Sequence, residues 1–164
     1  MPVSSSVIPE RAPRLPSLLA APLALLPMSL HSAIVAAAMN RVFTRARQEG
    51  ELDFLEGKVL RVEVHDARTG FRLTFKGGRL HPAKGDQPTD LTVGGTVYDL
   101  LLLAAGQEDP DTLFFQRRLT LDGNTELGLY VKNFLNGQDP QEVLPAPLRS
   151  ALPRLVPLYE RLFG

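Results

Sequence analysis

The chain contains no cysteine, so it can form neither a disulfide bond nor a thiolate metal site, and it lacks a cysteine nucleophile. The lack of cysteine is compatible with a reducing compartment. The chain also has no net charge, because 18 basic residues balance 18 acidic ones. No global electric field therefore attracts nucleic acid or an anionic membrane, and any electrostatic recognition must be local.

Motifs for catalysis are missing as well. The serines lie in no GxSxG elbow, and the two Gly-Gly pairs lack the residues of a phosphate-binding or dinucleotide-binding loop. The carboxylates of Asp109 and Asp111 fit a helix cap and first-turn charges better than an acid–base pair. The histidines show no metal-ligand spacing; they are His31, His65 and His81. We therefore predict a protein that is not an enzyme and has no catalytic residues, metal site or cofactor.

A long uninterrupted apolar run is also absent. Residues 1–14 are rich in serine and proline and predict a disordered or poorly packed tail. Residues 15–30, LPSLLAAPLALLPMSL, are apolar, but three prolines interrupt them, whereas a spanning helix needs about 20 unbroken apolar residues. Three interpretations remain open, namely short helical turns packed on the domain, a segment lying at a membrane interface, and a cleaved signal peptide.

The next helix is expected to begin at Ser29 or Ser32 and to end near Gln48. Its polar faces carry three arginines, which we interpret as a solvated face; if the preceding segment meets a membrane, they would lie near lipid headgroups. These residues are Arg41, Arg45 and Arg47. After it, residues 51–57 form a short turn with apolar side chains that we assign to the core.

Periodicity assigns most of the remaining chain. Period-two alternation predicts five strands, at residues 58–65, 70–76, 79–82, 89–93 and 114–121. Period-3.6 patterns predict helices at residues 97–105 and 125–135, and a last helix from about 147 or 150 to 163. Thr96, Asp109 and either Asn124 or Thr125 are the expected helix caps.

The predicted strand at 114–121 places Arg117 among apolar neighbours. A buried arginine is costly unless it is paired, so we expect it to contact a carboxylate of Asp109, Asp111 or Glu126. A phosphate headgroup is the alternative partner, because a planar guanidinium matches it well. If the strand has the opposite phase, the same reasoning applies to Arg118.

Two segments resemble a known family. Residues 107–135, QEDPDTLFFQRRLTLDGNTELGLYVKNFL, and more weakly residues 48–60, QEGELDFLEGKVL, are similar to the bacterial UbiT family of accessory factors of oxygen-independent ubiquinone biosynthesis. That family belongs to the sterol-carrier-protein-2 (SCP2) lipid-binding superfamily. The resemblance covers roughly residue 15 to the C-terminus. It implies one α/β (α+β) domain over residues 15–164, with a five-stranded, largely antiparallel sheet, helices on one face, and a hydrophobic lipid cavity between them.

The resemblance also implies a function. The chain would be a non-enzymatic carrier that binds a phospholipid or an isoprenoid quinone precursor, with the last helix, 147–163, as a candidate lid. Its expected partners are the hydroxylation factors of the ubiquinone pathway and the inner face of the cytoplasmic membrane, with no nucleic acid. Its expected location is the cytoplasm, peripherally on that membrane. From the inward faces of the predicted elements, we expect the lipid-binding residues to be Phe71, Leu73, Phe75, Phe115, Arg117, Leu119, Tyr130, Phe134 and Tyr159.

Two alternatives to this function remain. In the first, the domain is a solidly packed scaffold that organises biosynthetic enzymes without binding lipid. In the second, it is an enzyme built on a borrowed fold. Periodicity cannot separate a filled interior from a cavity lined by the same apolar residues.

Overall fold

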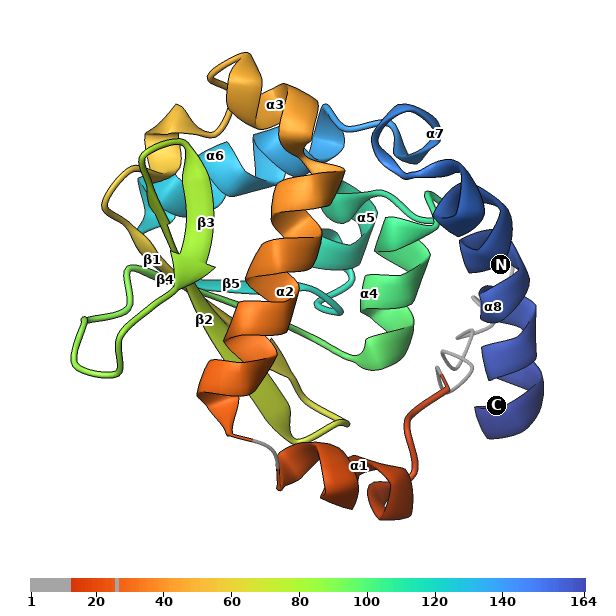
Figure 1. The fold of residues 1–164 in the computed structure, drawn as a ribbon. Coiled ribbons are helices and arrows are strands. Elements are labelled where there is room, and N and C mark those ends of the chain that lie inside the picture. The colour runs from red at the N-terminus through yellow and green to blue at the C-terminus, as the bar shows by residue number, and fades with distance from the viewer. Residues whose placement is uncertain (1–12, 26) are drawn as a thin grey trace, which may run out of the picture.

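The computed structural model describes residues 13–25 and 27–164, so the tail predicted for residues 1–14 lies, apart from its last two residues, outside the described part of the chain. One sheet has the strand order β3-β2-β1-β4-β5, antiparallel throughout except for the parallel pair β1 and β4 (Figure 1). The predicted mixed α/β fold with a largely antiparallel five-stranded sheet is confirmed. The strands are β1 (Val59–Val64), β2 (Thr69–Lys76), β3 (Arg79–Pro82), β4 (Leu91–Gly95) and β5 (Thr120–Gly123).

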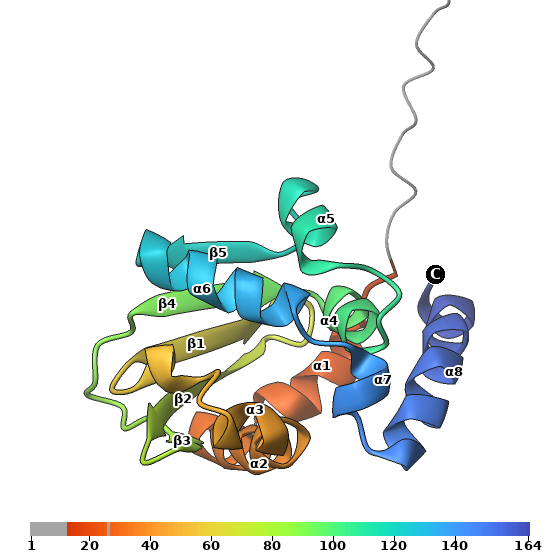
Figure 2. The ribbon, with the colours of Figure 1, turned by 90° about the horizontal axis from the view of Figure 1, so that it is seen from above.

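The helices surround this sheet on several sides. Figure 2 shows α2 and α3 beside β3, α5 and α6 near β5, and α8 outermost against α4. Two cores result, because α8 packs on α4 through a small cluster of its own. The helices are α1 (Ser17–Ala24), α2 (Met28–Val42), α3 (Thr44–Gln48), the 3-10 turn η1 (Asp53–Leu55), α4 (Val97–Ala104), α5 (Pro110–Phe115), α6 (Thr125–Asn136), α7 (Pro140–Val143) and α8 (Ala146–Phe163).

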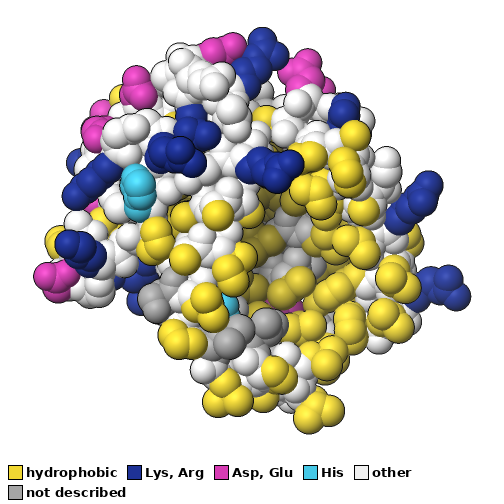
Figure 3. Space-filling model, viewed as in Figure 1, with side chains coloured by type: hydrophobic (Ala, Val, Ile, Leu, Met, Phe, Trp, Pro, Cys, Tyr) yellow, Lys and Arg dark blue, Asp and Glu magenta, His cyan; other side chains and the backbone are white. Residues whose placement is uncertain are grey.

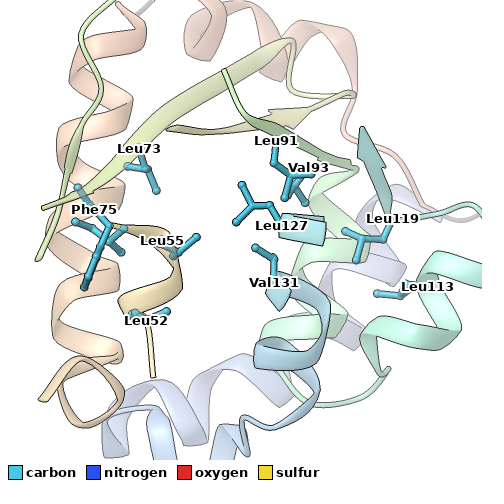
Figure 4. Close-up of a cluster of buried hydrophobic side chains, with 12 residues drawn as sticks. Leu52, Leu55, Leu73, Phe75, Leu91, Val93, Leu113, Leu119, Leu127 and Val131 are labelled. Carbon is cyan, nitrogen blue, oxygen red and sulfur yellow. The ribbon is translucent and has the colours of Figure 1, made fainter. Parts of the chain in front are cut away.

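Alternation along the strands separates an apolar from a polar sheet face. On the apolar face, Leu73 and Phe75 of β2 are each only 1% exposed. Figure 4 shows them in one cluster with side chains of β4, η1 and α6. On the opposite face, four polar residues that are neighbours across adjacent strands form one row, namely Arg72, Arg61, Thr92 and Asp122. Burial of the sheet face that carries Leu73 and Phe75 drives the sheet against its helices.

The predicted helix caps are confirmed. The Thr96 hydroxyl accepts a hydrogen bond from the Asp99 N–H at 3.2 Å, and the Asp109 carboxylate accepts one from the Thr112 N–H at 2.8 Å. Asn124, rather than Thr125, caps α6. These side chains satisfy backbone donors that a first helical turn leaves free.

The predicted start of the second helix is wrong. This helix begins at Met28, directly after Pro27, and ends at Val42, with residues 44–48 forming the separate helix α3. Ser32 caps nothing. It is buried within α2, where its hydroxyl accepts a hydrogen bond from the Arg72 N–H of β2 at 2.8 Å.

The predicted strand at 114–121 is also wrong in its first half. The helix started by Asp109 and Pro110 continues to Phe115, and Arg117 adopts a positive φ of 58° before β5 begins at Thr120. A strong helix start therefore overrides the alternation that follows it. The fourth strand is shifted in the same direction, to residues 91–95.

Helix α2 closes one edge of the sheet. The buried Asn40 amide donates to the Leu80 C=O at 2.8 Å and accepts from the Leu80 N–H at 2.7 Å, as a neighbouring strand would. Arg47 donates to the C=O groups of Asn40 and Gly78, so it is not part of a solvated face as predicted. Satisfied edge groups protect β3 from pairing with another chain.

We expect the variant Asn40→Ala to lower the free energy of unfolding by about 2 kcal/mol, because it leaves two buried backbone groups of Leu80 without partners. Urea unfolding measures this loss, and hydrogen exchange should accelerate at the Leu80 amide. Asn133→Ala, on the exposed side of α6, is the control and should change little. An unchanged Leu80 exchange rate in Asn40→Ala would contradict the edge-closing role.

Candidate functional site

The outward side of α2 is apolar although it faces solvent. Ser32, Ala36 and Asn40 point inward and are buried, which leaves the other side of the helix exposed. Ile34, in the middle of that side, is 59% exposed. Because these apolar side chains gain nothing from exposure to water, the outward side of α2 indicates a contact that the fold itself does not supply.

Exposed leucines on α1 and α8 extend this surface. On α8, Val156 is buried against Leu102 and Ala105 of α4, while leucines on neighbouring faces remain in solvent. We call the combined surface the apolar face. Its large members are Leu18, Leu19, Leu25, Leu30, Ile34, Leu148, Leu155, Leu158 and Leu162.

Figure 3 shows that the apolar face surrounds a hollow. Hydrophobic side chains gather along its edges, over α2 on one side, over α4 and α8 on the other, and over α1 at the lower end. We call this hollow the apolar groove. Exposed apolar surface of this extent is typical of a binding site.

An aromatic contact fixes α8 beside the groove. The Tyr98 hydroxyl of α4 donates to the Glu160 carboxylate of α8 at 2.6 Å, and the rings of Tyr98 and Tyr159 stack with their centroids 5.9 Å apart. Burial, reinforced by the hydrogen bond to Glu160, raises the pKa of Tyr98 to about 12. Burial, with the negative charge of Asp66 nearby, raises the pKa of Tyr159 to about 12. Both phenols therefore stay neutral in the folded protein well above neutral pH.

These pKa values predict a loss of stability at high pH. A phenol whose pKa is higher in the folded than in the unfolded chain contributes stability in full below pH 10, and this contribution disappears as the pH rises to about 12. We therefore expect the contact of α8 with α4 to weaken between pH 10 and 12, and an ultraviolet titration of the tyrosines together with hydrogen exchange in α8 measures this. The variant Tyr98→Phe should weaken that dependence. A titration of both tyrosines near pH 10 would contradict this half-buried contact.

The structure brings only some of the predicted lipid-binding residues together. Five lie in the main core cluster, namely Phe71, Leu73, Phe75, Leu119 and Phe134, of which Leu73, Phe75 and Leu119 are fully buried among packed side chains.

The other four lie elsewhere. Tyr130 lies at the edge of that cluster, 5.8 Å from the Phe54 ring, and Tyr159 lies beside the smaller core of α4 and α8. Phe115 and Arg117 are exposed, because the strand expected to turn them inward is not formed there. Sequence reasoning missed the outward side of α2, because the apolar run AIVAAAM at residues 33–39 has the same pattern whether it faces a core or a ligand.

The buried ion pair predicted for Arg117 belongs to Arg118. Its Nε atom donates to the Asp99 carboxylate at 2.8 Å, and the same carboxylate accepts a hydrogen bond from the Thr96 hydroxyl at 2.9 Å. None of the three carboxylates expected as partners is used. The alternative with the opposite strand phase therefore named the correct arginine, Arg118. Its carboxylate partner, Asp99, was not among those expected.

Other candidate sites are weaker. A pocket of about 390 Å³ lies between α3 and α7, but its arginines and glutamates mix both signs of charge. Across residues 13–25 and 27–164, no three metal-binding side chains come together. Within those residues no helix combines the length and the hydropathy needed to cross a membrane.

Comparison with known proteins agrees with this architecture. Residues 39–136 match the SCP-2 sterol transfer family. The ubiquinone biosynthesis accessory factor UbiT of Escherichia coli strain K12 is 39% identical over 145 residues, which cover 88% of this chain and 82% of that protein, and the UbiT of strain O157:H7 gives the same values. A solved structure described as the UbiJ-SCP2 ubiquinone synthesis protein has the same fold, with a TM-score of 0.53 and 22% identity over 65% of this chain and 94% of that one. The chain therefore belongs to the SCP-2 sterol transfer family and, within it, to the family of the UbiT accessory factors.

Proposed function

We propose that this protein is a non-enzymatic lipid-binding accessory factor of ubiquinone biosynthesis, which holds a phospholipid or an isoprenoid quinone precursor in the apolar groove. The observation that carries the proposal is the groove itself, with exposed apolar side chains of three helices around it (Figure 3). The 39% identity to a protein named for its role in ubiquinone biosynthesis supports the pathway. The resemblance of residues 107–135 supports its oxygen-independent branch.

The mechanism is desolvation of an apolar tail. Each methylene group moved from water into the groove contributes roughly 0.8 kcal/mol. A chain of about ten carbons therefore gains enough to offset the translational and rotational freedom that the lipid loses on binding. Helix α8 is the proposed lid, since it borders the groove and is held to α4 by the small cluster around Val156 and by the contact of Tyr98 with Tyr159 and Glu160. No bond is made or broken in this cycle.

We further propose that the apolar face meets the inner surface of the cytoplasmic membrane, so that the protein is cytoplasmic and peripheral. Exposed arginines accompany the exposed leucines on the same helices, namely Arg41 on α2 and Arg149, Arg154 and Arg161 on α8. Apolar side chains with basic neighbours are typical of helices that lie in the headgroup region of a bilayer.

Native mass spectrometry of the purified protein, followed by lipid analysis of the denatured sample, tests lipid binding. We expect one phospholipid or polyprenyl molecule per chain. A protein that carries no lipid, and that takes up none from added vesicles, would contradict the carrier function.

A second candidate function is a scaffold for the hydroxylation factors of the pathway that binds no lipid. The observation that favours it is the full burial of Leu73, Phe75 and Leu119 in the main core cluster, since these side chains were expected to line the cavity. The same mass spectrometry experiment distinguishes the two functions.

A further inference from the structure

Residues Phe114–Arg117 form a closed projection that we call the aromatic turn. The buried side chains of Leu113 and Leu119 anchor its two ends. The Leu113 C=O accepts hydrogen bonds from the Arg118 N–H at 2.8 Å and from the Leu119 N–H at 3.0 Å, which closes the turn on itself. A turn fixed in this way presents its side chains at low entropic cost to a partner.

The aromatic turn carries a large apolar side chain in solvent. Phe115 is 77% exposed, and its ring meets that of Phe114 edge to face, with centroids 5.9 Å apart. Arg117 follows with a φ of 58°, a conformation that costs energy for a residue other than glycine. Such strain is typically retained at functional sites. Neither Phe115 nor Arg117 belongs to the described cores.

The charged side chains around the turn differ in whether they form ion pairs. Asp99 is paired with Arg118, and Asp111 is paired with Lys132 at 3.0 Å. Arg117 forms no ion pair with any of the residues that the structure describes. The turn therefore presents one available positive charge two residues after Phe115, which fits a carboxylate and disfavours a second copy of the same turn.

The position of the turn argues against a membrane as its partner. Figure 2 shows α5 on the opposite side of the molecule from α2, which carries part of the apolar face. A flat bilayer in contact with α2 therefore leaves the aromatic turn directed away from it. Aromatic and arginine side chains are enriched where proteins bind one another.

We propose that the aromatic turn docks a partner protein through an apolar pocket that receives Phe115 and a carboxylate that pairs with Arg117. This inference rests on the proposed function, in that the partner is another protein of the quinone pathway. Docking on this side leaves the apolar groove free to exchange lipid while the partner is bound.

The test uses a strain that lacks this gene and is complemented with the full chain or its variants. Phe115→Asp and Arg117→Glu should each lower ubiquinone content at least fivefold, while the purified variants keep wild-type thermal unfolding and wild-type binding to phosphatidylglycerol-containing vesicles. Asn133→Asp, which adds a charge elsewhere on α6, is the control and should complement fully. Normal ubiquinone content in both turn variants would overturn the proposal.

Crosslinking then identifies the partner protein that the aromatic turn binds. A photoreactive phenylalanine analogue at position 115 should crosslink one protein, Arg117→Glu should abolish the crosslink, and reversing a carboxylate on that protein should restore it. Weaker vesicle binding by Phe115→Asp would assign the turn to a membrane, and a change from dimer to monomer in sedimentation would assign it to a second copy; either result overturns the proposal. If deletion of the gene leaves ubiquinone content unchanged, the proposed function fails. The docking proposal is then tested by the crosslink alone, and it is overturned if reversing a carboxylate on the crosslinked protein does not restore the crosslink to Arg117→Glu.

Discussion

Replacing Ile34 with glutamate is expected to weaken binding to phospholipid vesicles by at least thirtyfold. Burying an isoleucine side chain contributes roughly 1.5–3 kcal/mol, and a carboxylate in its place adds a cost of desolvation, so the total loss exceeds about 2 kcal/mol. Ile34 lies in the middle of the outward side of α2 and is more than half exposed, so the fold does not depend on it. Cosedimentation with vesicles measures the affinity, and native mass spectrometry measures the lipid retained.

The matched control is Leu129→Glu. Leu129 on α6 is 51% exposed, close to the exposure of Ile34, but it belongs to no helix of the apolar face. We expect this variant to bind vesicles and to retain lipid like the wild type. If the two variants lose binding equally, the effect is one of added charge, and the apolar face is not the lipid contact.

The variant Arg118→Met should lower the free energy of unfolding by about 3 kcal/mol. It removes the cation that pairs with Asp99, whose side chain is almost fully buried at the start of α4. Breaking a buried ion pair typically costs about 3–5 kcal/mol, and the partial exposure of Arg118 places this pair at the lower end of that range. Urea unfolding followed by circular dichroism measures the change.

A double variant separates the pair from the arginine alone. In Asp99→Asn with Arg118→Met, the amide oxygen still accepts the hydrogen bond from the Thr96 hydroxyl, and no charge remains buried. We expect the double variant to be more stable than Arg118→Met by about 1–2 kcal/mol, because no uncompensated carboxylate is left. Equal stabilities would show that the loss comes from packing of the arginine side chain instead.

The sequence by itself determined the elements whose signals are local. The caps at Thr96, Asp109 and Asn124 bond to backbone groups three residues away, so their partners stand beside them in the sequence. Strands β1, β2 and β3 follow the alternation of their own side chains, and α8 follows its own period. The family resemblance supplied the sheet that joins these elements.

Only the tertiary structure decided which polar residues pair and which apolar ones remain in solvent. Asn40 and Ser32 bond to backbone groups 40 residues away, and Arg118 reaches Asp99 across 19 residues. An apolar side chain has the same periodicity whether it faces a core or a ligand, so the exposure of Ile34 could not be predicted. The inward place expected for Phe115 failed for a related reason: the helix that begins at Asp109 competes with the strand for the same residues, and the burial of Leu113 and Leu119 on either side turns Phe115 outward.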